Sequence, residues 1–415
     1  MSVEIHARPA HNALLCPTCG KGTPHGGERY RKVMVRVAMV VTNPCAPDPR
    51  VLRHATWLAK AGYRVTIHAF DRSENYPLSE NINGVRIMRY RVGVVPYGGR
   101  ISTLMGLKKF TRKVRETLLH DPPELVYCHD ADTLKVGIAL KRAKSVPFVF
   151  DMHDLQHTWV RMEAPNSLSR SWVSRQFKQK MLSRAKQSEC IITSSGKVDG
   201  GSERGFAEWL EHHGLYGNVV ENRPMPPFPE PLTSTQEGWT VGYLGRIRDI
   251  KSFELLLASV RNMPILERPK IRIAGDGVAA PKVRRLMMDA VEAGEIEATV
   301  TGAFSAKEFS EIIQEVDVMY AMYSPLRGNI LQGALPVKMF DAASHGVPSV
   351  VNSGCLMGEI AQLENIGLPA LWNDPESVAS ALLSAKEMPV ELNHTGEREQ
   401  QRWLSAMDPV LKQLQ

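Results

Sequence analysis

Short apolar runs alternate with amphipathic stretches along most of this chain. Residues 33–41 are apolar except for Arg36, as expected of a strand buried on both faces of a parallel sheet. Apolar side chains then recur at helical spacing between Val51 and Ala59, and Gly62 ends the helix. Residues 64–70 are expected to form the next strand. A strand, a helix and a second strand in this order predict the start of a doubly wound α/β domain.

The same alternation predicts further elements up to residue 221. Strands are expected at residues 84–92, 124–128, 147–151, 189–193 and about 218–221. Helices are expected at residues 101–119, 133–143, 167–187 and 200–213. Residues 223–238 interrupt the pattern with a cluster of prolines, which suit neither a helix interior nor a central strand. This segment is therefore predicted to link two domains.

After the linker the pattern restarts. Strands are expected at residues 239–244, 271–274, 298–301, 317–322 and 347–351. Helices are expected around Phe253 and Leu257, at residues 280–292, 305–315, 336–345 and 376–387, and over the last twenty residues.

We therefore predict two Rossmann-like, doubly wound α/β domains that face each other across a cleft. The predicted parts are a flexible N-terminal tail at 1–32, a first domain at 33–222, the proline-rich linker at 223–238, a second domain at 239–392, and a C-terminal helix at 393–415 that packs back on the first domain.

Composition and charge narrow the classes of partner. The chain has 415 residues, of which 43% are hydrophobic and 23% charged, and this is typical of a globular protein of two or three domains. The net charge of +7 suits an anionic small ligand or weak attraction to an acidic membrane surface. No run of basic residues is interleaved with aromatic ones, so nucleic acid is not expected as a partner.

Neither an apolar run of membrane-spanning length nor a signal peptide is apparent, and six scattered cysteines suit a reducing compartment. The expected location is the cytoplasm, with peripheral contact at the inner membrane face. Cys16 and Cys19 have the spacing of half a zinc site, but no second pair of cysteines follows. A flexible extension without metal is the favoured interpretation of this tail.

One candidate site lies on the predicted helix at residues 336–345. Lys338 and Asp341 are three positions apart, so both side chains emerge from the same helix face. Pro336 suits the first turn, and Gly346 ends the helix before the next buried strand. A cation and a carboxylate at this sheet edge suit a polar ligand, although a solvated helix face gives the same pattern.

A second candidate site follows the first strand of the second domain. Gly242 and Gly245 allow a tight turn, after which Arg246 lies in the loop and Lys251 starts the next helix. Both cations can converge on an anion such as a diphosphate, whose negative charge grows as it departs. An exposed charged loop is the alternative.

These two segments resemble the donor site of GT-B fold retaining glycosyltransferases, the group 1 type also called glycosyltransferase family four. That family carries a Gly-x-x-Gly-Arg turn with a Lys five positions later, as here. It also carries Pro-x-Lys-x-x-Glu followed by Gly-x-Pro, which corresponds to Pro336, Lys338, Asp341, Gly346 and Pro348. The chain departs from the family at Asp341, which replaces Glu, and at Gly333, which stands where the family has an earlier Glu.

The resemblance spans about residues 34–390 and implies roles for individual residues. On the donor side, Arg246, Lys251 and Lys338 would bind the diphosphate and Asp341 the ribose. Gly275 and Gly277 would lie near the base, and Asn329 and the backbone around Leu335 near the sugar. The catalytic group would comprise His153, which contacts the donor sugar, with Asp130, Arg246 and Lys251. The acceptor side would contain Arg50, Asp130 and Asp154. Capping of the following helices is an equally open role for Asp132 and Asp154.

The function implied is transfer of a sugar from a UDP- or GDP-linked donor to a hydroxyl of a glycan or lipid-linked acceptor. The transfer would proceed with retention and without cofactor or metal, in the synthesis of a polysaccharide, glycolipid or glycoconjugate. Three alternatives remain at this point. Asp130 and Asp132 could hold a metal, as an Asp-x-Asp triplet does in the other major glycosyltransferase fold. The chain could be a nucleotide-sugar epimerase or hydrolase. It could also be a catalytically silent nucleotide-sugar-binding subunit, which Gly333 suggests.

Overall fold

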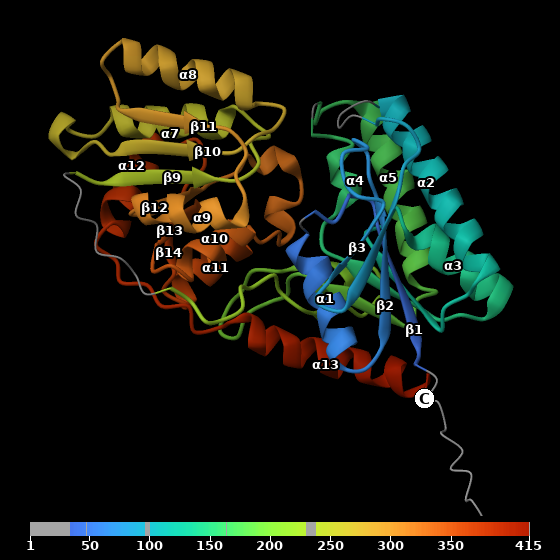
Figure 1. The fold of residues 1–415 in the computed structure, drawn as a ribbon. Coiled ribbons are helices and arrows are strands. Elements are labelled where there is room, and N and C mark those ends of the chain that lie inside the picture. The colour runs from blue at the N-terminus through green and yellow to red at the C-terminus, as the bar shows by residue number, and fades with distance from the viewer. Residues whose placement is uncertain (1–33, 47, 96–99, 163, 230–237, 415) are drawn as a thin grey trace, which may run out of the picture. The chain divides into compact units, whose positions relative to one another are not determined.

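A computed structural model describes residues 34–46, 48–95, 100–162, 164–229 and 238–414. The predicted tail with Cys16 and Cys19, and residues 230–237 of the predicted linker, lie outside the described residues. Two α/β halves account for most of the rest, each built on its own sheet (Figure 1).

The first sheet is parallel except at one edge. Its strand order is β3-β4-β2-β1-β5-β6-β7-β8, and β3 pairs with β4 antiparallel. In the centre, Val37 of β1 pairs with Val65 of β2 and Leu125 of β5. The strands are β1 (Arg36–Val41), β2 (Arg64–Phe70), β3 (Ser79–Ile82), β4 (Val85–Tyr90), β5 (Leu125–His129), β6 (Phe148–Met152), β7 (Cys190–Thr193) and β8 (Asn218–Val219).

Helices cover both faces of this sheet. The apolar side chains of α1 (Pro49–Lys60) and of the C-terminal helix α13 (Gly396–Lys412) join the core on one face. The other face is covered by α2 (Arg100–His120), α3 (Leu134–Lys144), α5 (Leu168–Ala185) and α6 (Phe206–Glu211). A single-turn helix, α4 (Gln156–Trp159), precedes α5. Trp403 of α13 is fully buried between α1 and the sheet, so the end of the chain is part of the first core.

The second sheet is parallel throughout, in the order β11-β10-β9-β12-β13-β14. Its strands are β9 (Thr240–Leu244), β10 (Lys270–Ala274), β11 (Ala298–Thr301), β12 (Val318–Ala321), β13 (Ser349–Asn352) and β14 (Gly367–Ala370). One face packs against α7 (Lys251–Arg261), α8 (Ala280–Glu292) and α12 (Pro375–Ala385). The other packs against α9 (Ala306–Ile312), α10 (Val337–Ala343) and α11 (Leu356–Leu363). Short 3-10 turns are η1 (Ile265–Glu267), η2 (Ile313–Glu315), η3 (Pro325–Arg327) and η4 (Ile330–Gln332).

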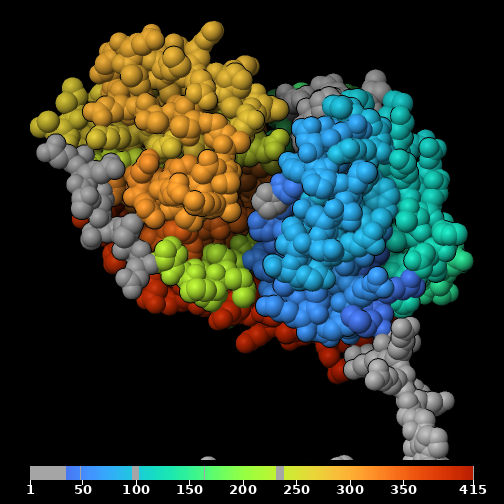
Figure 2. All heavy atoms as spheres, in the orientation of Figure 1, coloured from blue at the N-terminus to red at the C-terminus, as the bar shows by residue number. Residues whose placement is uncertain are grey.

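The segment after β8 carries the chain from the first sheet to the second, and part of it is visible on the surface in yellow-green (Figure 2). Its first residues are nevertheless anchored. The guanidinium of Arg223 is fully buried and donates hydrogen bonds to Glu221 at the end of the first half and to Glu364 after α11. It also lies 4.2 Å from the ring centroid of Phe340 in α10.

The prediction of two Rossmann-like domains is confirmed, but several elements differ. The helix expected at 200–213 begins only at Phe206, because residues 200–205 contain three glycines and run as an extended loop. β3 was not predicted, since it is a short edge strand and three of its four side chains are polar. α11 and β14 were also not predicted. Across the described residues, no helix is both long and apolar enough to cross a membrane.

Candidate active site

Polar side chains from both halves gather where the parallel strands end. A cavity of about 490 Å³ is lined by His153, Asp154, Arg246, Lys338 and Asp341, among others. A larger one of about 1050 Å³ is lined by Arg50, Asp130, His153, Arg246 and Lys251, among others. The two share His153, Trp159, Arg246, Arg248 and Arg327, so they are adjoining parts of one cleft. The carboxyl ends of strands are where open α/β sheets bind ligands.

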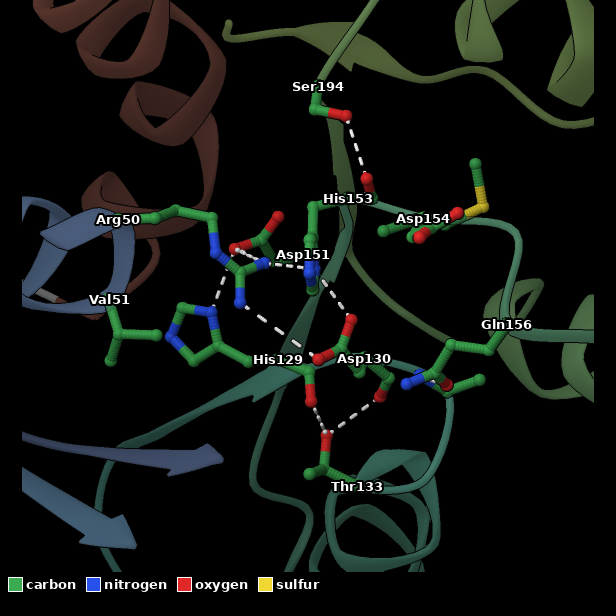
Figure 3. A network of polar contacts seen from close by, with 12 residues as sticks. Arg50, Val51, His129, Asp130, Thr133, Asp151, His153, Asp154, Gln156 and Ser194 are labelled. Atoms are coloured by element: carbon green, nitrogen blue, oxygen red, sulfur yellow. Dashed lines mark hydrogen bonds and ion pairs between the residues drawn. The ribbon is translucent and has the colours of Figure 1, made fainter. Parts of the chain in front are cut away.

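A buried charge network supports the first-half side of this cleft (Figure 3). Arg50, in the first turn of α1, contacts Asp151 at the end of β6 over 3.2 Å. His129 Nδ1, at the end of β5, lies 2.8 Å from the same carboxylate oxygen. Although burial opposes ionisation, these partners keep the pKa of Asp151 well below its ordinary value. Arg50 is only 8% exposed, so its charge is largely satisfied within the protein.

The network extends to His153, which borders both cavities. Its Nδ1 lies 2.6 Å from Asp130 Oδ1 and also contacts the guanidinium of Arg50 (Figure 3). Burial and the charge of Arg50 oppose protonation, but Asp130 and Asp151 outweigh them and raise the pKa of His153. Asp130 adopts a left-handed backbone conformation with φ of 69°. This unusual conformation aims its carboxylate at the imidazole.

Asp154 forms a direct contact between the two halves. Its Oδ1 accepts a hydrogen bond of 2.7 Å from Asn329 Nδ2 in the second half, and its Oδ2 accepts one of 3.1 Å from Trp159 Nε1. The backbone amide of Leu155 donates to Oδ1 as well. Three donors therefore already occupy this carboxylate, which lines the smaller cavity.

The turn after β9 presents a row of cations. Arg246 borders both cavities, whereas Lys251 borders the larger one with an exposed side chain. The β10–α8 loop supports this turn, because Gly245 N donates to Ala274 O and Ile247 N donates to Asp276 O.

Gly275 and Gly277 explain how the two loops come so close. A Cβ on Gly275 would lie 1.8 Å from Gly245 O, and one on Gly277 would lie 2.1 Å from Ile247 O. Neither glycine borders the two cavities described above. Both glycines therefore allow close backbone packing under the cationic turn.

Lys338 has an electrostatically unfavourable place in this structure. Its Nζ lies 3.1 Å from the ring centroid of Tyr243 and, among the described residues, has no hydrogen-bond partner. Burial, with the nearby charge of Arg327, lowers the pKa of this amine well below its ordinary value. A buried cation without an anionic partner is costly unless a ligand supplies the anion.

Asp341, one helical turn from Lys338, is also destabilised in its charged form. Burial raises its pKa to about 7, and Arg53 of α1 only partly offsets this effect. Leu335 borders the same cavity, and Asn329 Oδ1 is a buried acceptor with no partner in the described part of the chain. The smaller cavity therefore offers both a donor and acceptors to a ligand.

Comparison with known proteins decides the family. The family described as "Glycosyl transferase 4-like domain" matches residues 46–199. The family described as "Glycosyl transferases group 1" matches residues 238–387. These two matches cover both halves of the fold, in the order of the chain. The chain belongs to the group 1 glycosyltransferases of GT-B fold.

Individual relatives agree with this family. The curated protein "Succinoglycan biosynthesis protein ExoL" from Rhizobium meliloti (strain 1021) is 23% identical over 355 residues, which is 81% of each chain. Sucrose-phosphate synthase from Thermosynechococcus elongatus has a TM-score of 0.69 at 15% identity, over 92% of this chain and 99% of its own. Anabaena HepE, solved with UDP-glucose, has a TM-score of 0.59 at 12% identity, over 90% and 100%. These identities establish a shared fold.

Local packing explains why Gly333 stands where other members of the family have an acid. Gly333 ends the 3-10 turn η4 with a φ of 101°, which strongly favours glycine. A Cβ here would lie 2.4 Å from Gly205 Cα and 2.7 Å from Arg204 O in the first half. The loop from the first half thus occupies the space that a glutamate side chain would need.

Several residues of the glycosyltransferase site were not found from the sequence. They are His129 and Asp151 in the buried network, and Tyr243, Arg248, Tyr323 and Arg327 around the cavities. Asp151 had a detectable signal, since it ends a predicted strand beside the already noted His153. His129 had the same signal, since it follows the predicted strand at 124–128 and precedes Asp130. The remaining four positions had none, because their neighbours come from distant parts of the chain.

The two carboxyl groups of the Asp-x-Asp triplet, Asp130 and Asp132, have different surroundings. Asp130 faces His153 and Arg50. Burial and the charge of Asp130 raise the pKa of Asp132 to about 6. Within the ranges that the structure describes, no group of three or more His, Cys, Asp or Glu side chains could hold a metal ion. Asp132 does not cap α3 either, since the residue at the cap is Thr133.

Proposed function

We propose that this glycosyltransferase transfers a sugar from a UDP- or GDP-linked donor to an acceptor hydroxyl, with retention of configuration and without a bound metal or other cofactor. The observation that carries the proposal is the smaller cavity. It combines the unpartnered buried amine of Lys338 with an unpartnered buried oxygen of Asn329 and the carboxyl group of Asp341. A nucleoside diphosphate sugar supplies an anion, hydroxyl donors and a sugar in one molecule.

The second half would hold the donor. Arg246 and Lys338 border the smaller cavity and Lys251 borders the adjoining one, so a diphosphate across the junction would meet three cations. Their charge would stabilise the diphosphate as the glycosidic bond breaks, which is the role a metal ion serves elsewhere. Asp341 would accept hydrogen bonds from the ribose hydroxyls.

The first half would position the reacting sugar and the acceptor. His153, held by Asp130 and Arg50, would contact sugar hydroxyls where the two cavities meet. Asp154 would hold Asn329 in place through its 2.7 Å hydrogen bond. Retention would follow if the acceptor approaches the face that the diphosphate leaves, and the leaving phosphate takes the acceptor proton.

The acceptor would occupy the larger cavity, beside Arg50 and Asp130. The curated relative is described as a succinoglycan biosynthesis protein, and this supports a role in polysaccharide synthesis with a glycan or lipid-linked acceptor. HepE was solved with UDP-glucose, which supports a UDP-linked donor. A cytoplasmic enzyme in peripheral contact with the inner membrane face would suit such an acceptor.

A thermal-shift screen against UDP-, GDP- and ADP-sugars tests the donor. A donor that binds only the folded state raises the melting temperature, and one nucleotide class should do so. The donor found in this way is then incubated with membrane and glycan extracts, and proton NMR of the product gives its anomeric configuration.

Retention predicts that the product has the configuration of the donor sugar. Inversion would contradict the proposed mechanism. Formation of free nucleotide and altered sugar at full rate without acceptor would instead identify a hydrolase or epimerase.

A further inference from the structure

Three neighbouring helices of the first half hold an unusual share of the positive charge. Residues 102–120 of α2, together with α3 and α5, contain fourteen Lys or Arg residues but only one acid, Glu116. The full chain has 51 basic and 44 acidic residues, so 37 basic and 43 acidic residues remain elsewhere. This basic layer therefore carries a net charge of +13, while the rest of the chain is net negative at −6.

The charges form one continuous surface. All three helices pack on the same face of the first sheet, with α3 next to both α2 and α5 (Figure 1). Ten of the fourteen basic side chains are exposed, including all five on α2. Burial and the charges of Arg184, Lys108 and Lys180 lower the pKa of Lys135. Positive charges on all three helices therefore repel one another. Such mutual repulsion is costly unless a partner supplies negative charge.

Large apolar side chains project at one end of the basic layer. Leu104 and Met105 in the first turns of α2 are 68% and 55% exposed. Leu168 and Trp172 in the first turns of α5 are 87% and 62% exposed, and they share a face because they are four positions apart. We refer to these four side chains as the apolar rim.

The first turns that carry the apolar rim lie close to the larger cavity. Val95, just before α2, and Pro165, just before α5, both line that cavity. The side chain of Val95 also packs on Gly106 in α2, where an added Cβ would lie 2.6 Å away. The first turns of both helices are therefore close to the cavity in which the acceptor is proposed to bind.

We propose that the basic layer and the apolar rim bind the surface of an anionic lipid bilayer. Lys and Arg near such a surface each add to the attraction, and exposed Trp and Leu side chains enter the interface between headgroups and acyl chains. A polyanion such as nucleic acid or an acidic glycan would pair with the charges but would not require the apolar rim. This inference rests on the proposed function and deepens it, because an acceptor cavity close to a membrane surface suits a lipid-linked acceptor.

Vesicle flotation with the full chain tests the surface. Wild-type protein should float with vesicles that contain about one third phosphatidylglycerol and remain behind with pure phosphatidylcholine. Reversing three charges (K108E, K109E and K113E) should lower the partition coefficient about a hundredfold or more. The matched control reverses three exposed cations of the second half (K282E, R285E and K307E) and should change it less than about twofold. The pair Leu168→Ser and Trp172→Ser should weaken binding about tenfold or more.

Two results would overturn the proposal. One is failure of wild-type protein to float with anionic vesicles. The other is a Leu168→Ser and Trp172→Ser variant that floats like wild type, which would indicate a site for polyanions instead. The melting temperature of each variant shows whether it is folded. If the triple variant of α2 does not fold, the triple variant R142E, K144E and K180E is used in its place. Flotation needs no turnover, so a chain that floats but binds no nucleotide sugar contradicts only the proposed function.

Discussion

At the scale of single residues, the candidate site is marked by groups that the protein leaves electrostatically unsatisfied. Lys338 Nζ is buried without a partner in the described structure, and Asp341 is half-buried with Arg53 only partly offsetting its charge. Elsewhere, buried charges such as Asp151 and Arg223 have several partners each. Binding sites commonly reduce stability in this way, because their polar groups are arranged for a ligand.

Replacing Lys338 should therefore separate stability from binding. Lys338→Met removes a buried amine that has no anion beside it, so the free energy of unfolding should rise by about 1 kcal/mol. Donor affinity should fall about tenfold or more, because the diphosphate loses a cation. Urea unfolding and titration calorimetry measure the two effects. A destabilised variant with wild-type donor affinity would contradict this account of Lys338.

Asp341 should make donor binding depend on pH. Its pKa of about 7 means that the acid is largely neutral below this pH, whereas ribose hydroxyls donate best to the carboxylate. Binding should thus release a proton, and donor affinity should increase about tenfold between about pH 6 and pH 8. The diphosphate of a nucleotide sugar stays ionised over this range. Titration calorimetry of donor binding to wild type and Asp341→Asn checks this, since the variant should lose the pH dependence. If the variant kept the pH dependence of wild type, Asp341 would not be a donor ligand.

Gly333 should be essential to the fold rather than replaceable by the family's acid. Gly333→Ala places a side chain in a left-handed conformation against the backbone of Gly205, and should cost about 3 kcal/mol or more. Gly302→Ala is the matched control, because a Cβ there meets nothing within 4 Å, and its effect should be within about 0.5 kcal/mol. Thermal unfolding compares them. Similar melting temperatures for both variants would contradict the proposed steric constraint.

At the scale of elements, what could be predicted from the sequence depended on local spacing. Lys338 and Asp341 could be paired because three positions on a helix share a face, and the doubly wound order followed from apolar runs of the right length. The bond between Asp154 and Asn329 could not be predicted, since 175 positions separate them. The packing of Gly275 on the backbone of Gly245 could not be predicted either, because the pairing of strands β9 and β10 brings the two together.

The same limit applies to the joint between the halves. Arg223 appeared to be part of a proline-rich linker, yet it connects the end of β8 to Glu364 after α11 through two hydrogen bonds. Glu221 and the ring of Phe340 complete its surroundings. Local composition predicts a break between domains at this segment, but it could not predict the packing of the first residues of the segment.

Removing this guanidinium should destabilise the protein. Arg223→Ala leaves the carboxylates of Glu221 and Glu364 without their buried partner, and should cost about 3–5 kcal/mol. Arg261→Ala breaks an exposed ion pair with Glu295 and should cost less than about 1 kcal/mol. Chemical denaturation measures both. Equal losses would show that Arg223 is not a structural anchor.

At the scale of the whole molecule, two α/β halves bring different contributions to one cleft. The second half lines it with cations and an acid, and the first half lines it with His153 and the charge network behind it. The net charge of the chain conceals a basic layer of +13 against a remainder of −6. The mild overall value of +7 therefore understates how strongly one face can attract an anionic partner.

The central claim is that the cationic turn after β9 stabilises a departing diphosphate, and turnover of Lys251→Ala tests it most directly. Sugar transfer from the donor identified by thermal shift is compared among wild type, Lys251→Ala and the exposed control Lys282→Ala. We expect Lys251→Ala to lower the turnover rate at least about a hundredfold, equivalent to about 2.7 kcal/mol of barrier, with Lys282→Ala unchanged. Near wild-type turnover of Lys251→Ala would contradict the claim.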